Sequence, residues 1–245
     1  MSTYWGQRSN EGSLQEFCDT GAVKHLCHSK HRNPACQRRG VKLHLSLGGN
    51  GTQTLCSPDD ASQVAEYLWK TYLAPGTTGP LGDAPLDGID FSNVSPSPYW
   101  DDLVRALAEF NSPQKKVYLS AWATCSYPDP VLGKAIDTGL FDYIWLNYYQ
   151  NPECGCDTGI SCVLASWFKW SCSLPAGKLL FFNLGTCFLS QVFTAISYSP
   201  NYGGFLALVH HFNDIKNIYQ VRCSQQSLYS EGSLASVRGL NNMVA

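Results

Sequence analysis

The chain has 245 residues, a length that suits one large domain with a sizeable buried core. Apolar residues make up 44% of the sequence and charged residues only 15%, a balance that excludes an intrinsically disordered chain. The formal net charge of −2 gives no general attraction to nucleic acid, and no apolar run reaches the ~18 residues of a membrane-spanning helix. We therefore expect neither nucleic acid nor a membrane as a partner.

The cysteine content indicates an oxidising compartment. The chain has 11 cysteines, and the odd number leaves at least one thiol unpaired. The segment Met1–Trp5 has neither the charged start nor the apolar run of a signal peptide. We therefore expect either that a leader has been removed ahead of this sequence or that the chain is an incomplete gene product.

The first part of the chain predicts two strands separated by a polar loop. Tyr4–Gln7 ends a very short first strand. The segment Gly21–Gly40 is too short and too polar for a further strand and helix, and the basic residues from Lys24 to Arg39 indicate a solvated loop. Val41–Gly49 is then a clear strand that ends in glycines.

A helix is expected after this second strand. It begins at Ser57, a capping residue followed by a proline and by two acidic residues in the first turn. Val64, Leu68 and Tyr72 then recur four residues apart and define one apolar face.

The next strand, Leu86–Val94, carries two carboxylates and runs into a proline-containing loop. Asp87 and Asp90 stand among apolar, β-prone residues. A buried carboxylate is costly unless it is hydrogen-bonded or functional. Two interpretations stay open: the carboxylates belong to a site at the end of the strand, or they tie down loops by accepting bonds from backbone amides.

The rest of the chain alternates strands with helices. The expected strands are Val117–Ala121, Phe141–Tyr149, Lys178–Leu184 and Gly204–Val209, and the expected helices are Tyr99–Phe110, Ile160–Ser171 and Leu189–Tyr198. This alternation within one domain favours a (β/α)₈ barrel over an open doubly wound sheet. About seven strands are recognisable, so we expect an incomplete barrel that lacks its second strand. The barrel is assigned to residues 1–220, and the Ser- and Asn-rich residues 221–245 are expected to form a loose tail.

The strand Leu86–Val94 resembles the catalytic strand of glycoside hydrolase family 18, the chitinase family, whose signature is D-x-x-D-x-D-x-E. Asp87 and Asp90 fall on the first two carboxylates of that signature. Ser92 stands where the third Asp would be, and Val94 stands where the catalytic Glu would be. The segments Tyr4–Leu14 and Ser46–Gly49 are similar to those of the plant class III chitinases, and the resemblance is strongest from Leu81 to Cys154.

The resemblance implies a chemistry that this sequence lacks the means to perform. In this family the N-acetyl oxygen of the substrate attacks the anomeric carbon, and the Glu protonates the leaving oxygen. A Tyr aligned with Tyr149 bonds the acetamido group, and Asn147 takes the place of a Gln that assists it. General acid catalysis contributes about 10²–10⁴-fold, and Val94 cannot donate a proton. Ser92 cannot supply the charge of the Asp.

The resemblance also implies binding residues, disulfides and a location. The positions carried over as substrate-binding are Tyr4, Gly48, Gly49, Trp122, Asn147 and Tyr149, whereas Leu208 stands where a sugar-stacking Trp is usual. The implied disulfides are Cys18–Cys36 and Cys125–Cys154. An extracellular or vacuolar location is implied, and no cofactor is expected.

Several functions remain open at this point. The favoured one is a chitinase-like protein without hydrolytic activity, which binds chito-oligosaccharide or a partner protein in plant defence. The alternatives are an endochitinase that weakly hydrolyses β-1,4 N-acetylglucosamine links, with Asp90 or Glu153 rescuing the acid, a xylanase-inhibitor-like protein that binds a glycosidase, and the product of a decayed gene copy. A zinc site from Cys27, His28, His31 and Cys36 fits the spacing, but Cys36 has an implied disulfide partner, so no metal is expected.

Overall fold

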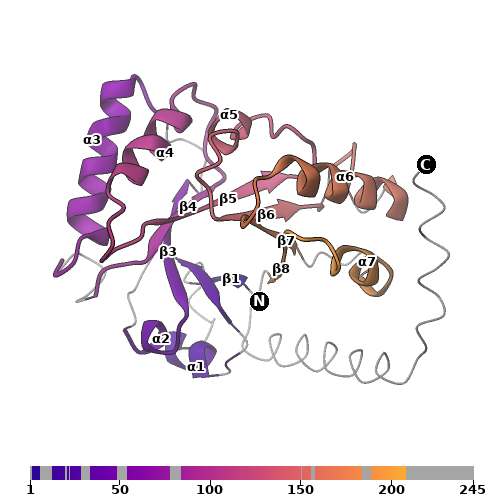
Figure 1. The fold of residues 1–245 in the computed structure, drawn as a ribbon, viewed down its shortest axis with the longest axis horizontal. Helices are drawn as coiled ribbons and strands as arrows, with labels where there is room; N and C mark the ends of the chain where they lie inside the picture. Colours follow the sequence, from indigo (N-terminus) through magenta and orange to yellow (C-terminus); the bar gives the residue numbers. More distant parts are fainter. Residues whose placement is uncertain are drawn as a thin grey trace.

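The computed structural model describes residues 2–5, 13–19, 21, 23–28, 34–48, 54–77, 84–149, 151–155, 158–183 and 189–207. Within these residues, eight parallel strands pair in sequence order and close into a barrel (Figure 1). The strands are β1 (Ser2–Trp5), β2 (His25–His28), β3 (Lys42–Gly48), β4 (Gly88–Ser92), β5 (Tyr118–Thr124), β6 (Tyr143–Asn147), β7 (Leu179–Asn183) and β8 (Tyr202–Ala207). The predicted (β/α)₈ barrel is therefore confirmed.

The prediction that the second strand is missing is wrong. β2 is only four residues long, and it pairs with β1 on one side and with β3 on the other. Its polar sequence concealed it, because strand patterns are usually recognised by β-branched and aromatic residues. The His25 ring lies inside the barrel against the Tyr143 ring, with 4.2 Å between ring centroids. Aromatic packing and two hydrogen-bonded neighbours thus replace the usual aliphatic side chains.

The barrel is abbreviated in other respects. The closing pair, β1 with β8, contains two residue pairs, whereas β3 and β4 share five. Three of the outer helices are short: α1 (Leu14–Asp19), α2 (Pro34–Arg38) and α5 (Gly133–Ile136). The predicted solvated loop from Lys24 to Arg39 instead contains β2 and α2.

The longer helices were predicted within a few residues of their observed ends. They are α3 (Pro58–Leu68), which continues as the π-helical turn η1 (Trp69–Leu73), α4 (Trp100–Glu109), α6 (Ile160–Ser173) and α7 (Leu189–Ile196). The cap at Ser57 forms as expected, with the Asp60 N–H donating to its Oγ at 3.0 Å. Figure 1 shows these helices outside the strands, with α3 beside α4 and α6 beside α7.

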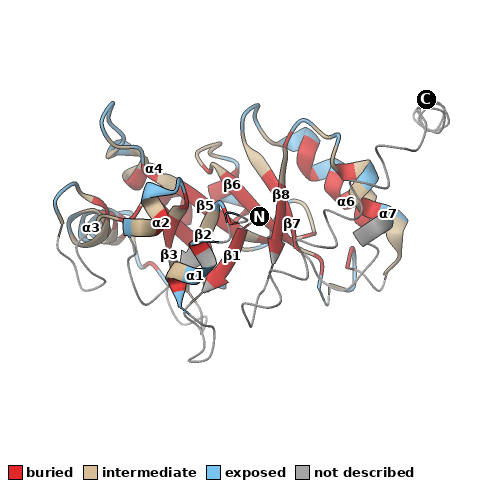
Figure 2. Ribbon diagram, turned by 90° about the horizontal axis from the view of Figure 1, so that it is seen from below, coloured by how far each residue is buried: buried red, intermediate tan, exposed pale blue. Residues whose placement is uncertain are grey.

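The buried residues form two clusters. One lies inside the barrel and contains Tyr4, Tyr143, Trp145, Phe181 and Leu206. The larger one fills the space between the strands and the helices, so buried residues follow the strands and exposed ones lie on the outer faces of the helices (Figure 2). Inward and outward side chains alternate along each strand, which fixes the residues that face the barrel axis.

Both implied disulfides are present. Cys18–Cys36 joins α1 to α2, and Cys125–Cys154 joins the end of β5 to the loop after β6. Cys56, Cys162 and Cys172 are exposed thiols. In the part of the chain that the structure describes, no helix is long and apolar enough to cross a membrane. The described residues end at 207, so the assignment of the tail to 221–245 stays a prediction.

Candidate functional site

The centre of the barrel is a buried carboxylate that accepts four hydrogen bonds. Asp90 lies on β4, faces the barrel axis and is fully buried. Its Oδ1 accepts from the Ser120 hydroxyl at 2.7 Å and from the Trp145 Nε1–H at 2.8 Å. Its Oδ2 accepts from the Tyr4 and Ser46 hydroxyls, both at 2.9 Å. Side chains from five strands therefore converge on one carboxylate.

Burial and hydrogen bonding act on Asp90 in opposite directions. Removal from water raises the pKa of the Asp90 carboxyl, and the four donors counteract part of that rise. Ser120 also bonds His44, whose Nδ1 lies 3.0 Å from the Ser120 Oγ. Ser120 and His44 were not identified from the sequence. Their position on the inward faces of β5 and β3 is the signal that would have found them.

Asp87 lies at the other end of the same strand. Its carboxylate accepts from Gln37 Nε2 at 2.9 Å and from the backbone N–H of Leu43 at 3.0 Å, and it pairs with Lys42 at 3.4 Å. These contacts tie α2 and β3 to the start of β4, as the interpretation of a backbone-binding carboxylate expects. The structure does not bring Asp87 together with Asp90.

The two positions that the family signature gives to acids lie at the C-terminal end of β4. Ser92 is the last residue of the strand and is partly exposed. Val94 is 8% exposed and belongs to the hydrophobic cluster between strands and helices. The backbone between them is unusual, because Asn93 has a φ of 50°. The residue at the position of the proton donor is thus packed in an apolar environment.

Gly48 is held close to the same strand end. It has a φ of 106°, and a Cβ on it would lie 1.8 Å from the Ser92 carbonyl oxygen. Only glycine fits this contact, so Gly48 shapes the rim through its backbone. Gly49 and Leu208 lie outside the described residues.

The aromatic residues predicted to bind substrate are divided between different environments. Tyr4 is buried and uses its hydroxyl on Asp90, and its ring packs edge-on against that of Trp122 at 5.5 Å. Trp122 on β5 is partly exposed. Tyr149 follows β6 and is 57% exposed. Trp122 and Tyr149 are therefore the aromatic faces still open to a ligand.

Two amides lie side by side at the ends of β6 and β7. The Asn147 Oδ1 accepts from the Tyr149 backbone N–H at 3.0 Å and from the Asn183 Nδ2 at 3.2 Å. Asn183 is 3% exposed and was missed at the sequence stage of prediction, because a single Asn after an apolar strand resembles an ordinary loop residue.

Glu153 lies in the loop after β6. Its carboxylate accepts from the Ser126 hydroxyl at 2.8 Å and lines a shallow hollow of about 350 Å³ beside the Cys125–Cys154 disulfide. The structure thus places Glu153 among loop and α6 residues, with Ser126 as its partner.

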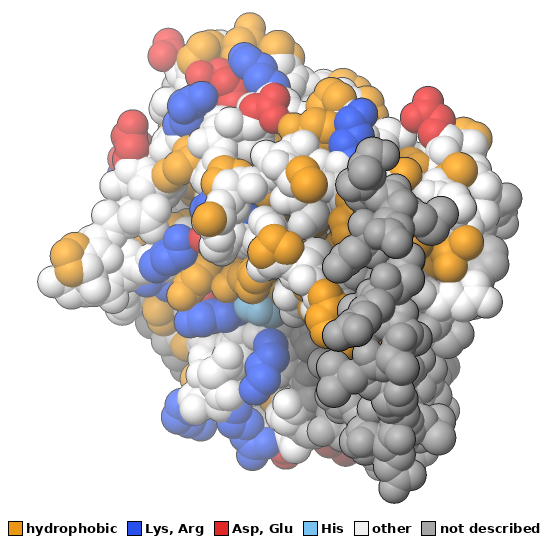
Figure 3. Space-filling view, turned by 45° about the vertical axis from the view of Figure 1, so that its right-hand side comes forward, with side chains coloured by type: hydrophobic (Ala, Val, Ile, Leu, Met, Phe, Trp, Pro, Cys, Tyr) orange, Lys and Arg blue, Asp and Glu red, His pale blue; other side chains and the backbone are white. Residues whose placement is uncertain are grey.

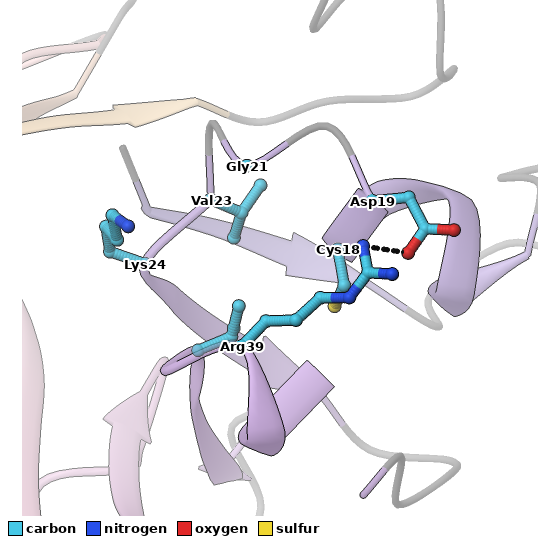
Figure 4. Close-up of a pocket in the computed structure, with 7 residues that line it drawn as sticks. Cys18, Asp19, Gly21, Val23, Lys24 and Arg39 are labelled. Carbon is cyan, nitrogen blue, oxygen red and sulfur yellow. Dashed lines mark ion pairs between the residues drawn. The ribbon is translucent and has the colours of Figure 1, made fainter. Parts of the chain in front are cut away.

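A second hollow, of about 250 Å³, lies between α1, β2 and β3 and is lined by Cys18, Asp19, Gly21, Val23, Lys24, Arg39 and Val41. Figure 4 shows the Arg39 guanidinium paired with the Asp19 carboxylate there, so the two charges compensate each other. The suggested zinc site loses Cys36 to its disulfide. His31 and the side chains of Cys27 and His28 lie outside the described residues.

The N-terminal end of the barrel is filled by stacked rings. Tyr118, Tyr143 and Trp145 stack in succession, and Lys42 and Lys116 place their Nζ atoms 4.8 and 5.2 Å from the Tyr118 ring centroid. Figure 3 shows a face on which basic side chains surround a histidine and hydrophobic side chains. Ligand access is therefore expected at the opposite end, where sites of parallel barrels are found.

Fold and site together define a (β/α)₈ barrel of the kind that carries its site at the C-terminal ends of the strands. The chain is 38% identical over 266 residues to an acidic endochitinase of Cicer arietinum, covering 89% of each protein. No family model matches the chain. The chain belongs to the plant acidic endochitinases and is a chitinase-like protein of glycoside hydrolase family 18.

Solved structures lead to the same family. A chitinase from Ipomoea carnea matches with a TM-score of 0.75 and 34% identity, covering 84% of this chain and 93% of that one. A xylanase–α-amylase inhibitor protein, solved in complex with trehalose, matches with a TM-score of 0.78 and 28% identity, covering 88% and 94%. Proteins named as an enzyme and as an inhibitor of enzymes thus share this fold.

Proposed function

We propose that this chain binds chito-oligosaccharide at the C-terminal end of its barrel without hydrolysing it. One observation carries the proposal: at the position of the family's proton donor stands Val94, which is 8% exposed within the hydrophobic cluster. Ser92, at the position of the neighbouring Asp, is uncharged. General acid catalysis contributes about 10²–10⁴-fold and charge stabilisation about 3 kcal/mol, and such groups act as a unit.

Rescue by Asp90 is disfavoured by its hydrogen bonds. Both carboxylate oxygens already accept two bonds each, and the side chain is fully buried. Protonating a leaving oxygen would require Asp90 to abandon donors that no other described acceptor replaces. Glu153, the other candidate, is bonded to Ser126 beside the disulfide. The exposed faces of Trp122 and Tyr149 nevertheless remain suited to stacking on a sugar.

A second function, binding a glycosidase, is favoured by the structural likeness to the xylanase–α-amylase inhibitor protein. An extracellular or vacuolar location fits either function, because both disulfides require an oxidising compartment to persist. A role in plant defence would follow from either ligand.

The test combines binding and turnover in one sample. Titration calorimetry with chitotetraose should show heat of binding, and mass spectrometry of the same sample after prolonged incubation should show intact tetramer. Turnover that disappears in a Tyr149→Phe variant would contradict the proposal and support a weak endochitinase. Absence of heat with chitotetraose, together with inhibition of a xylanase or α-amylase, would favour the glycosidase-binding function.

Thermal unfolding of the same preparation tests the decayed-gene alternative. A cooperative melting transition would reject that alternative. Aggregation without a transition would support it and would contradict the proposed binding function.

A further inference from the structure

The amide pair, defined as Asn147 and Asn183, faces the interior of the barrel at its C-terminal end. Each residue is the last of its strand, β6 or β7. Two residues earlier, Trp145 and Phe181 pack against each other inside the barrel, with ring centroids 4.5 Å apart. Since side chains alternate along a strand, Asn147 and Asn183 occupy the next inward layer above these rings.

The orientation of both amides is fixed by their hydrogen bonds. The Tyr149 backbone N–H can only donate, so the Asn147 atom at 3.0 Å from it must be the oxygen. The Asn183 atom that lies 3.2 Å from this same oxygen must therefore be the donor nitrogen. The remaining amide oxygen of Asn183 consequently points away from the pair.

That oxygen is a buried acceptor without a donor. Asn183 is 3% exposed, and within the described part of the chain no donor reaches its Oδ1. Buried amide oxygens nearly always find partners. Asn201, 5% exposed at the other end of the barrel, shows the usual use of such a side chain, since it donates to the Lys178 carbonyl at 3.1 Å.

We propose that the Asn183 Oδ1 accepts a hydrogen bond from a hydroxyl or an N–H of the bound saccharide, and that the amide pair selects neutral ligands rich in donors. This inference rests on the proposed function, because it assigns a specificity residue to the same site. An N-acetylglucosamine unit carries both kinds of donor. Neither amide titrates, so the contact does not change its charge with pH.

The experiment compares chitotetraose affinity and melting temperature in the wild type, Asn183→Ala and the isosteric Asn183→Leu. Loss of a neutral hydrogen bond should weaken the affinity about 3- to 10-fold. The melting temperature of Asn183→Leu should stay level or rise, because the substitution removes an unpaired buried oxygen. Asn201→Ala is the matched control, and it should lower the melting temperature while leaving the affinity unchanged.

The outcomes separate this inference from the function on which it rests. If the wild type binds and both Asn183 variants bind equally well, Asn183 is not the acceptor and the proposed function stands. If the wild type does not bind chitotetraose, the proposed function fails and this inference fails with it. Weaker binding by Asn201→Ala to the same degree would show a general structural effect and overturn the assignment.

Discussion

Replacing Asp90 should show how strongly its network holds the barrel together. In Asp90→Ala, the donors of Tyr4, Ser46, Ser120 and Trp145 lose a shared acceptor in a fully buried position. At a net value of about 1 kcal/mol for each bond, the loss should be about 4 kcal/mol of the free energy of unfolding. That loss would be a large part of the ~5–15 kcal/mol that stabilises a typical domain.

Asp90→Asn separates the shape of the network from its charge. The Asn oxygen can take the place of Oδ1 and accept from Trp145 and Ser120, while the Tyr4 and Ser46 hydroxyls rotate to accept from the new NH₂ group. The substitution also removes the desolvation cost that raises the pKa of Asp90. We therefore expect Asp90→Asn to lose no more than about 1–2 kcal/mol.

Urea unfolding at pH 7, followed by tryptophan fluorescence and by far-ultraviolet circular dichroism, measures both variants. Coincident transitions would justify a two-state analysis. A loss below about 1 kcal/mol for Asp90→Ala would refute the argument, because it would mean that the four donors find water or other acceptors at little cost. Equal losses for the two variants would show instead that the charge, and not the set of bonds, stabilises the interior.

Three further predictions follow from single contacts. Val94→Glu buries a carboxylate and should cost about 2–4 kcal/mol in calorimetric unfolding without restoring turnover, whereas Ser92→Asp at the exposed strand end should be tolerated; chitinase activity in either variant would contradict this. Gly48→Ala should cost about 2 kcal/mol or more, because its Cβ meets a carbonyl oxygen, and Gly76→Ala, also at positive φ but with open space, should cost about 1 kcal/mol. His25→Phe should flatten the acid limb of the stability profile, since burial lowers the pKa of His25 to about 4, so that the unfolded chain takes up the proton first and stability falls from pH 6.5 towards 4 by up to about 3 kcal/mol; a wild-type profile flat over this window would contradict it.

The repeating pattern of the chain was sufficient to predict the barrel, because each strand–helix unit has its own local signals. α3 shows this well, since a capping Ser, a Pro and two acidic residues define its start without any knowledge of the rest. β2 escaped because its stability comes from neighbours distant in sequence. Its His25 packs on Tyr143, and no local pattern records that contact.

The candidate site was predictable only in part, for the same reason. A carboxylate in an apolar strand identified Asp90 as special, but its donors stand 30, 44, 55 and 86 residues away along the chain. Strand register decides which side chains meet, and a shift by one residue would turn every one of them outward. The amide pair depends on register in the same way, since Asn183 acquires its meaning only next to Asn147.

The geometry explains how such a barrel can lose its acid and still keep its fold. Ser92 ends β4 and Val94 follows it, so substitutions there change the rim of the barrel but leave the strand pairing intact. Asp90, only two residues before Ser92, is bonded to side chains on four other strands, and its replacement disturbs all of them together. Catalytic power therefore depends on rim residues that the fold does not need, while the interior carboxylate is needed by both. A protein of this construction can turn from hydrolysis to binding by changes at the rim alone, and the free energy of unfolding of Asp90→Ala relative to Ser92→Asp measures that division.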